Sequence, residues 1–259
     1  MDKFLLIEGV SMVFETRKGS FTALRDIDLA VAKGEFVSLI GHSGCGKSTL
    51  LNLVAVLLEP SGGILVLSGR EIAGPGPDRG VVFQEYALLP WMTVIDNVAL
   101  GPKLRGVPKD ARHAIARRYL AMANLSDAET KYPHELSGGM KQRTAVARTL
   151  ANEPEVMLMD EPFAAIDAQT RMTLQEELLR IWAQSRVTVL FVTHSVEEAC
   201  FLGDRVAVLT PGPGRVKEIV AIDIPRERRN WATLGADPEF ARIKERVLAS
   251  VRGPQGASP

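Results

Sequence analysis

The first 35 residues carry short apolar runs that predict β-strands. These runs fall at residues 4–10, 11–14 and 22–31. Within the last run, residues 26–31 alternate polar and apolar side chains, as a strand with one buried face does. Residues 17–20 have the charged and small side chains of a hairpin-like turn. The chain is therefore predicted to begin with strands joined by a tight turn.

Farther along, apolar runs of strand length alternate with helical patterns, an order typical of an α/β fold. Strands are expected at residues 36–40, 64–67, 80–83, 156–159, 188–192 and 205–209. Helices are expected at residues 50–54, 144–151, 168–184, 196–202 and 238–250.

The pattern changes between residues 85 and 154. Strand patterns are missing from this stretch, and residues 109–123 show a helical pattern with basic side chains on its outer face. We interpret the stretch as a helical subdomain inserted into the α/β core. The expected divisions are residues 1–84 with 155–224 for the core, 85–154 for the insertion, and 225–259 for a C-terminal tail with one helix.

Composition narrows the class of protein. Lysine plus arginine equals aspartate plus glutamate at 31 each, so the formal net charge is zero. Broad nucleic-acid binding usually needs a basic face, so we expect no nucleic-acid partner. The two cysteines, Cys45 and Cys200, form no disulfide framework or metal spacing, which fits a reducing cytosol. No apolar run approaches the roughly 18–20 residues of a membrane helix, and no signal-peptide pattern opens the sequence. Any membrane role is expected to be peripheral, through a partner.

The strongest chemical signal is a glycine-rich loop between a predicted strand and a predicted helix. Its spacing, G-x-x-x-x-G-K-[ST], is that of the P-loop, whose backbone N–H groups and helix N-terminus bind phosphates. Lys47 can reach the β- and γ-phosphates, Ser48 can ligate Mg²⁺, and Thr49 can contact the α-phosphate. The sequence therefore predicts a nucleoside triphosphate site. The loop comprises Gly41, His42, Ser43, Gly44, Cys45, Gly46, Lys47, Ser48 and Thr49.

Polar side chains follow three other predicted strands. Gln84 ends one strand, where its neutral amide can reach a metal ion or a water molecule. Asp160 and Glu161 follow the strand at 156–159, the Walker-B arrangement, in which Asp160 would hold Mg²⁺ and Glu161 would polarise the attacking water. His194 follows another strand, at the sheet edge where ligands bind in open α/β folds. We predict that it contacts the γ-phosphate and the attacking water.

Ser137, Gly138 and Gly139 precede a predicted helix. Ser137 is a good N-cap, and the two glycines allow a phosphate to approach the helix start closely. Taken alone, these residues are a common turn. Their position between the P-loop and Asp160 favours a nucleotide contact instead.

Two further residues complete the nucleotide-binding candidates. Asp167 ends the loop that follows Glu161 and precedes a long predicted helix. Phe14 is our choice over Phe21 for a side chain that stacks on adenine, and the alternative is that Phe14 is a core residue.

Taken in order, these motifs resemble the nucleotide-binding subunits of ABC transporters. The set comprises the P-loop, Gln84, residues 136–139, Asp160 with Glu161, and residues 193–194. The resemblance covers nearly the whole chain. It implies a P-loop NTPase fold with a RecA-like core, a small antiparallel β-subdomain and an inserted helical subdomain, with ATP and Mg²⁺ as cofactors. It also implies that two copies, or one copy and a related cassette, clamp two ATP molecules, the P-loop of one facing Ser137 and Gly139 of the other.

Three positions depart from the usual family pattern without removing a catalytic group. Met140 stands where glutamine is commoner, Ile166 stands where leucine is usual, and Val56 stands where a glycine is often found.

Within the family, residues 88–98, residues 193–199 and the Pro225-Arg226 pair resemble the importer subunits for nitrate, sulfonates and taurine. This implies an ATPase at the cytoplasmic face of the cell membrane that powers uptake of a small anionic solute. Its partners would be transmembrane permease subunits and a solute-binding protein. In such proteins residues 84–97 grip a helix of the membrane subunit. An exposed Trp91 would suit that contact, and the alternative is a core tryptophan.

Two other roles are compatible with the same site chemistry: an exporter subunit, and a soluble ABC ATPase acting on ribosomes or DNA. The arginine cluster at residues 226–229 is expected to be a solvated face, with docking as the alternative. Residues 253–259 are expected to be disordered.

Overall fold

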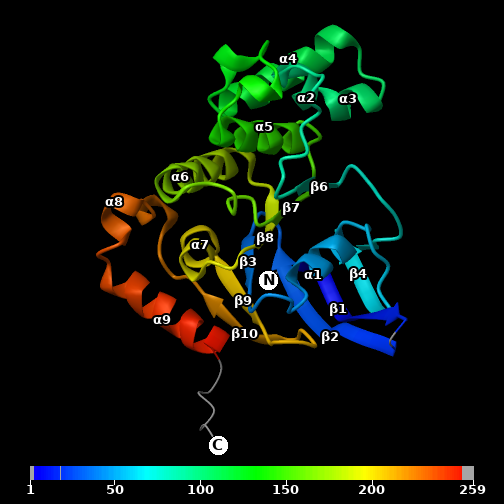
Figure 1. Cartoon of the computed structure of the whole chain (residues 1–259), viewed down its shortest axis with the longest axis vertical. Helices are drawn as coiled ribbons and strands as arrows, with labels where there is room; N and C mark the ends of the chain where they lie inside the picture. The colour runs from blue at the N-terminus through cyan, green and yellow to red at the C-terminus, as the bar shows by residue number, and fades with distance from the viewer. Residues whose placement is uncertain (1–2, 18, 253–259) are drawn as a thin grey trace, which may run out of the picture. The chain divides into compact units, whose positions relative to one another are not determined.

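The computed structural model describes residues 3–17 and 19–252, which divide into two compact units (Figure 1). Unit 1 contains Met1–Pro75 and Thr188–Pro259, and unit 2 contains Gly76–Val187. The predicted helical insertion, residues 85–154, lies within unit 2. The expected division into core, insertion and tail stays a prediction. The segment 253–259, expected to be disordered, lies outside the described residues.

One sheet of unit 1 is antiparallel. Its strand order is β2-β1-β4-β5, with β1 at Lys3–Thr16, β2 at Gly19–Ala32, β4 at Gly62–Leu67 and β5 at Arg70–Glu71. The strands predicted at 4–10 and 11–14 are one strand whose register is irregular between Ile7 and Val10. Gly9 lies in this irregularity with a φ of 58°, which glycine adopts without strain. The predicted turn at 17–20 includes Lys18, which lies outside the described residues.

The second set of strands in unit 1 positions the phosphate loop. β3 (Phe36–Ile40) runs parallel to β8 (Thr188–Val192) on one side and to β9 (Arg205–Leu209) on the other. β3 and β8 are buried along their whole lengths, as continuous apolar runs in a parallel sheet should be. The helices α1 (Lys47–Val54) and α7 (Val196–Leu202) follow β3 and β8 along the chain. Because β3 and β8 are parallel neighbours, the loops after them emerge at one edge.

Unit 1 also contains elements that the sequence patterns did not indicate. β10 (Val216–Ala221) pairs antiparallel with β9, and its largely exposed surface explains its weak apolar pattern. The C-terminal segment has more than the one helix expected. It comprises a 3-10 turn (Arg226–Arg228), α8 (Trp231–Leu234) and α9 (Pro238–Arg252). Figure 1 shows α9 alongside α7 and the β9–β10 pair, all of which it contacts.

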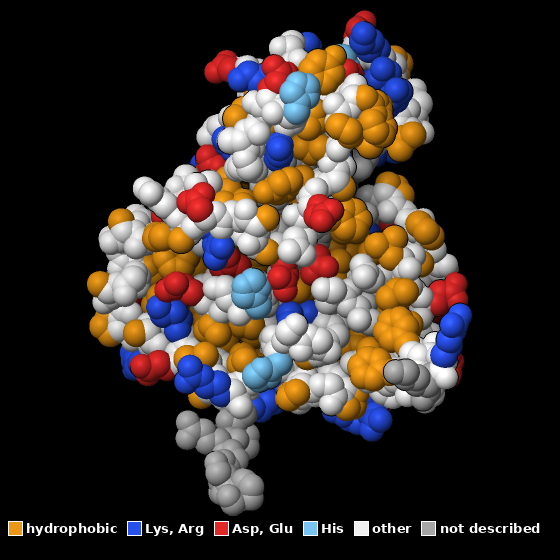
Figure 2. All heavy atoms as spheres, in the orientation of Figure 1, with side chains coloured by type: hydrophobic (Ala, Val, Ile, Leu, Met, Phe, Trp, Pro, Cys, Tyr) orange, Lys and Arg blue, Asp and Glu red, His pale blue; other side chains and the backbone are white. Residues whose placement is uncertain are grey.

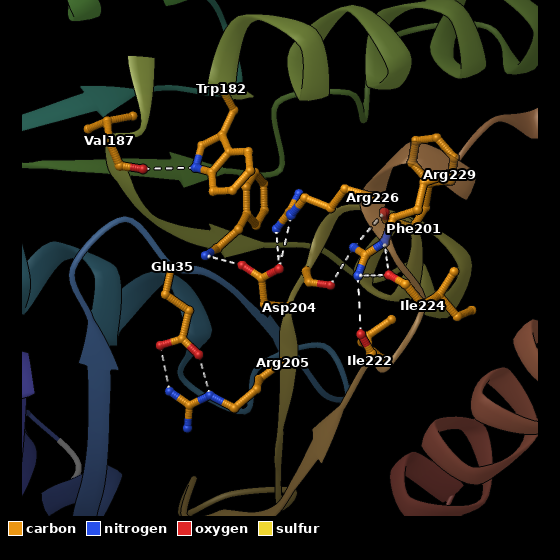
Figure 3. A network of polar contacts seen from close by, with 12 residues as sticks. Glu35, Trp182, Val187, Phe201, Asp204, Arg205, Ile222, Ile224, Arg226 and Arg229 are labelled. Carbon is orange, nitrogen blue, oxygen red and sulfur yellow. Dashed lines mark hydrogen bonds and ion pairs between the residues drawn. The ribbon is translucent and has the colours of Figure 1, made fainter. Parts of the chain in front are cut away.

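The prediction that residues 226–229 are a solvated face is wrong for two of the arginines (Figure 3). Arg229 is 6% exposed and donates hydrogen bonds to the carbonyl oxygens of Phe201, Gly203, Ile222 and Ile224. Burial, followed by the nearby charge of Arg226, lowers the pKa of Arg229 to about 10. Arg226 forms an ion pair with Asp204 at 2.6 Å. These contacts bind the C-terminal segment to the end of α7 and to the residues that follow β10.

Unit 2 combines a pair of parallel strands with a group of helices. β6 (Arg79–Val82) pairs with β7 (Val156–Asp160). The helix expected to start at residue 144 begins at Gly138, because the side chain of Ser137 caps it by accepting a hydrogen bond from Met140 N at 3.3 Å. The helices of unit 2 are α2 (Val94–Val98), α3 (Leu100–Leu104), α4 (Lys109–Met122), α5 (Gly138–Leu150) and α6 (Ala168–Ser185), with 3-10 turns at Ser126–Ala128 and Pro133–Glu135.

The described helices include none that combines the length and the apolar character needed to cross a membrane.

Val56 shows why glycine is often found at its position. Its φ is 56°, in the left-handed region just after the end of α1, where the Val56 N–H donates to Leu53 O at 3.1 Å. A β-branched side chain is strained in this region, whereas glycine is not. The preceding residue, Ala55, keeps a right-handed helical conformation with a φ of −73°. The turn after α1 therefore requires a backbone conformation that is unfavourable for valine.

We predict that Val56→Gly increases the free energy of unfolding by about 1 kcal/mol, because the relief of left-handed strain exceeds the entropy gained by the unfolded chain. Ala55→Gly is the matched control and should decrease stability, since Ala55 is unstrained. Urea denaturation of both variants provides the test. If Val56→Gly lost as much stability as Ala55→Gly, the inference that the backbone at Val56 is strained would be wrong.

Candidate active site

The phosphate loop of unit 1 is shaped by close packing around its glycines. Gly46 has a φ of 94°, and a Cβ there would lie 2.5 Å from Leu24 Cδ2. A Cβ on Gly41 would lie 2.8 Å from Cys45 Sγ and 2.9 Å from Leu209 O. Both positions therefore require glycine. Because neither glycine has a side chain, the loop can pass through this narrow space between buried β3 and α1.

The amino end of α1 has the features of an anion site. Gly46 is its N-cap residue and offers no side-chain hydrogen bond to the first turn. The leading N–H groups of a helix lack partners within the helix and carry partial positive charge. Gly44 has a φ of 76° and open space where a Cβ would be. The chemistry and geometry of this helix start fit a phosphate group.

The side chain of Lys47 crosses the loop that precedes it. Lys47 is 6% exposed, and its Nζ donates to Gly41 O at 3.0 Å and to His42 O at 3.1 Å. A buried ammonium is costly unless it has hydrogen-bond partners, and these carbonyl oxygens supply them. The ammonium thus lies inside the loop, with Ser48 exposed and Thr49 half-buried immediately after it.

A second loop follows β8, the parallel neighbour of β3, at the same edge of the sheet. It carries His194, which is exposed. Thr193 on one side is 1% exposed and donates from Oγ1 to Glu198 at 2.6 Å. Ser195 on the other side is the N-cap of α7 and accepts from Glu198 N at 3.3 Å. Both neighbours of His194 are therefore fixed to the first turn of α7.

In unit 2, β6 and β7 bring a second group of candidates together. Because these strands are parallel neighbours, Gln84, two residues beyond β6, and Asp160, the last residue of β7, follow the same strand edge. Gln84 is exposed, and Asp160 is half-buried. Glu161 has a φ of 44°, a left-handed conformation that is unusual outside glycine. Local strain of this kind often occurs at functional sites.

The other predicted residues have local structural roles in unit 2 that the sequence partly indicated. Ser137 is the N-cap of α5. Asp167 is the N-cap of α6 and accepts from Thr170 N at 3.0 Å, a hydrogen bond that lowers the pKa of its carboxyl group. A Cβ on Gly138 would meet only Tyr86 Oη, at 3.6 Å, and one on Gly139 would lie 3.4 Å from Leu174. Neither glycine has a positive φ, so internal packing does not require glycine at Gly138.

Phe14 and Phe21 are directly paired across β1 and β2. Phe14 is half-buried, and Phe21 is 53% exposed. The choice of Phe14 as the adenine-stacking residue therefore stays a prediction.

Arg148 makes a loop contact beside Gln84 that the sequence patterns missed. It lies on α5 and donates to Ala87 O at 2.5 Å and to Tyr86 O at 2.9 Å. Burial lowers its pKa from the ordinary arginine value. Tyr86 and Ala87 both have positive φ values, 56° and 47°. Arg148 therefore holds a strained loop that begins directly after Gln84. No motif in the sequence indicates this long-range contact.

We predict that Arg148→Ala loosens the loop at residues 85–88. Loss of two hydrogen bonds from a charged donor should lower the local opening free energy by about 1–3 kcal/mol. Amide hydrogen exchange of residues 85–88 provides the measurement. The control is Arg105→Ala, which removes an exposed arginine bonded to Asn152 at 2.7 Å. Equal exchange in both variants would contradict the role of Arg148.

The chain belongs to the ABC transporter family, whose match covers residues 24–164. It is 51% identical over 251 residues to an uncharacterised ABC transporter ATP-binding protein of Methanocaldococcus jannaschii, covering 96% of this chain and 94% of that one. It is 48% identical over 253 residues to the bicarbonate transport ATP-binding protein CmpD of Synechococcus elongatus, covering 95% of this chain and 90% of that one. These findings confirm the resemblance to ABC transporter ATP-binding subunits.

Solved structures agree on the fold. A dimeric bacterial ABC transporter cassette, also solved in a post-hydrolysis state with ADP and Pi, matches with a TM-score of 0.73 and 30% identity, covering 86% of this chain and 100% of that one. The cassette cbiO1 of Clostridium perfringens matches with a TM-score of 0.76 and 26% identity, covering 86% and 90%. The predicted α/β P-loop fold is confirmed as an ABC ATPase cassette.

Proposed function

We propose that this chain hydrolyses ATP to drive an importer of a small anionic solute. The observation that carries the proposal is its 48% identity, over 95% of the chain, to a protein named for bicarbonate transport. A second protein of that name, CmpC of the same organism, is 50% identical over 96% of this chain, which spans 38% of CmpC. Bicarbonate is a small anion, as are nitrate and the sulfonates suggested by the sequence motifs. Taurine, also suggested by them, carries an anionic sulfonate group.

In this proposal, the phosphate loop binds the triphosphate. The N–H groups at the start of α1 surround the phosphate oxygens, and Lys47 moves its ammonium from Gly41 O and His42 O to the β- and γ-phosphates. Thr49 contacts the α-phosphate, and Phe14 stacks on the adenine. The short distances from Lys47 Nζ to both carbonyl oxygens support this role, since they place the charge within the loop.

Ser48, Gln84 and Asp160 are the residues that would hold Mg²⁺. Hydroxyl, amide and carboxylate oxygens are the donors that this hard cation prefers. Ser48 is exposed at the first turn of α1, and Gln84 and Asp160 follow parallel strands of unit 2. The chemistry of these three side chains fits the ion. When bound, Mg²⁺ would neutralise charge on the phosphate oxygens.

Glu161 and His194 are proposed to act on the water that attacks the γ-phosphate. Glu161 accepts a proton from this water and orients it. The left-handed backbone at Glu161 supports a functional role, because local strain often occurs at functional sites. His194 donates a hydrogen bond to the γ-phosphate. The contacts of Thr193 and Ser195 with Glu198 support this role, because they restrict the loop that carries His194.

A second cassette is proposed to complete the site. Ser137 and Gly139 of one copy would face the phosphate loop of the other, with Asp167 near the shared nucleotide. The only neighbour that a Cβ on Gly138 would meet is Tyr86 Oη, at 3.6 Å, which supports close approach by a group from outside the chain. A related cassette has been solved as a dimer.

The loop that contains Trp91 is proposed to dock on a membrane permease subunit at the cytoplasmic face. Trp91 is 70% exposed, which excludes the alternative of a core tryptophan. Buried Asn97 makes the loop rigid through hydrogen bonds with Leu89, Met92 and Thr93. Figure 2 shows apolar side chains gathered over α3, where Leu104 is 79% exposed. An exposed tryptophan on a hydrogen-bonded loop, together with exposed apolar side chains on α3 of the same unit, suits protein docking.

Affinity purification of the tagged protein from gently solubilised native membranes, with mass spectrometry of its partners, tests the proposal. We expect a multi-span membrane protein together with a solute-binding protein that takes up bicarbonate, nitrate, sulfonate or taurine. Recovery of a membrane protein from an export system would mean that the chain serves an exporter and not an importer. Recovery of ribosomal or DNA-bound partners alone would overturn the transporter assignment.

We predict that Lys47→Ala raises the Kd for ATP at least about ten-fold, because a charged hydrogen-bond donor to the phosphates is lost. Isothermal titration calorimetry provides the measurement. Lys33→Ala, a change at an exposed lysine of the same unit, should leave the Kd unchanged. An unaltered Kd in Lys47→Ala would mean that the ammonium does not bind the nucleotide.

We also predict that Glu161→Gln lowers kcat at least about 100-fold while ATP still binds, since the amide cannot accept the proton of the attacking water. Steady-state ATPase assays and calorimetry measure the two effects separately. Glu155→Gln, an exposed change just before β7, should keep normal turnover. Normal kcat in Glu161→Gln would remove this residue from the catalytic step.

A further inference from the structure

The carboxyl end of α9 is attached to the phosphate loop. His42 Nε2 lies 2.9 Å from the carbonyl oxygen of Val251, in the last turn of α9. A carbonyl oxygen only accepts hydrogen bonds, so His42 Nε2 carries the hydrogen and donates it. Lys217 on β10 donates from Nζ to Ser250 O at 2.5 Å. The last carbonyl groups of a helix lack partners within the helix and carry partial negative charge, so His42 and Lys217 together cap α9.

The attachment acts on the backbone that holds Lys47. The side chain of His42 bonds to α9, while the backbone carbonyl of the same residue accepts a hydrogen bond from Lys47 Nζ at 3.1 Å. His42 is exposed, so its contact with α9 is a directed hydrogen bond rather than core packing. His42 therefore links α9 to the backbone carbonyl that accepts a hydrogen bond from Lys47 Nζ.

The same helix is attached to α7. Lys244 on α9 pairs with Glu197 on α7, with Nζ and Oε1 2.9 Å apart. Trp231, on α8, stacks on Phe201 of α7 with ring centroids 4.1 Å apart and planes inclined by 9°. The ring of Phe240 on α9, which is fully buried, meets the other side of this cluster at 6.2 Å from Trp231. The C-terminal segment therefore packs along α7.

Arg229 fixes the far end of α7 (Figure 3). It donates to Phe201 O at 3.1 Å and to Gly203 O at 2.7 Å, where α7 ends. Arg226 pairs with Asp204, whose carboxylate also accepts from the N–H of Phe36 at 2.9 Å, at the start of β3. The contacts of Ser195 and Thr193 with Glu198 connect the first turn of α7 to the His194 loop. The loop that carries His194 is therefore attached to α7.

We propose that residues 226–252 act as a brace that positions two loops of the ATPase site, with His42 and Lys244 as positioning residues. One end of α9 holds the phosphate loop through His42, and its side holds α7, and hence the His194 loop, through Lys244. This inference rests on the proposed ATPase function. It assigns to His42 a side-chain role besides that of its backbone, and to the C-terminal segment control over both ATP binding and turnover.

The first test measures steady-state ATPase kinetics of the full chain with His42→Ala and His42→Gln. Loss of the hydrogen bond to Val251 O should raise KM for ATP about five-fold, with little change in kcat. The amide that His42→Gln introduces is still a hydrogen-bond donor, so this variant should recover most of the lost affinity. Lys217→Met, which loosens the same end of α9 from outside the phosphate loop, should raise KM in the same direction.

The second test compares two variants of α9. Lys244→Met removes the link to α7, whereas Arg246→Met removes an equivalent pair with Glu218 on β10, 2.7 Å long. We expect Lys244→Met to lower kcat about three- to five-fold with KM unchanged, and Arg246→Met to leave kcat unchanged. Thermal melting of both variants monitors the fold. If Lys244→Met lowers the melting temperature no more than Arg246→Met does, the lower kcat of Lys244→Met reflects loss of the position of the His194 loop and not a loss of stability.

The outcomes separate this inference from the proposed function. Absence of ATPase activity in the unmodified chain with its partners would contradict the proposed function itself. Normal activity in the unmodified chain, with KM unchanged in His42→Ala and Lys217→Met, would overturn the role of the α9 end. An equal rise of KM in His42→Ala and His42→Gln would also overturn it, because the donor would then be irrelevant. Equal kcat values for Lys244→Met and Arg246→Met would overturn the link to His194.

Discussion

The buried ammonium group of Lys47 constrains the nucleotide-binding side of this cassette. Its Nζ is held by the carbonyl oxygens of Gly41 and His42, and a charge at this depth would be costly without them. The loop must therefore fold back over the start of α1, which requires the close packing that only glycine allows at Gly41 and Gly46. The same folding leaves the leading N–H groups of α1 available to a phosphate.

Pairs of parallel strands explain how residues far apart in the sequence come to lie at the same edge of a sheet. In unit 1, β3 and β8 end at one edge, so the phosphate loop and the His194 loop are neighbours in the fold although they lie far apart in the sequence. In unit 2, β6 and β7 do the same for Gln84 and Asp160. The C-terminal segment adds polar contacts to the loops of unit 1, through His42 at one end of α9 and Arg229 at the end of α7.

The elements with continuous apolar runs were predictable from the sequence. The strand at 205–209 and the helix at 196–202 have the predicted bounds, and the phosphate loop has the predicted strand and helix on its two sides. Contacts between a side chain and a distant backbone were not predictable. Arg229 was expected in solvent because its carbonyl partners come from segments without a spacing pattern. Arg148 was missed for the same reason, because its contact leaves no periodic or spaced signal. The strain at Val56 had an indirect signal, since glycine is often found at this position.

The most direct test of the account is an experimental structure of the Glu161→Gln variant with ATP and Mg²⁺. The account predicts that Lys47 Nζ leaves the carbonyl oxygens of Gly41 and His42 to contact the phosphates, and that Ser137 of a second copy contacts the same nucleotide. Electron density for ATP away from the start of α1, or a nucleotide contacted by residues of one chain alone, would contradict it.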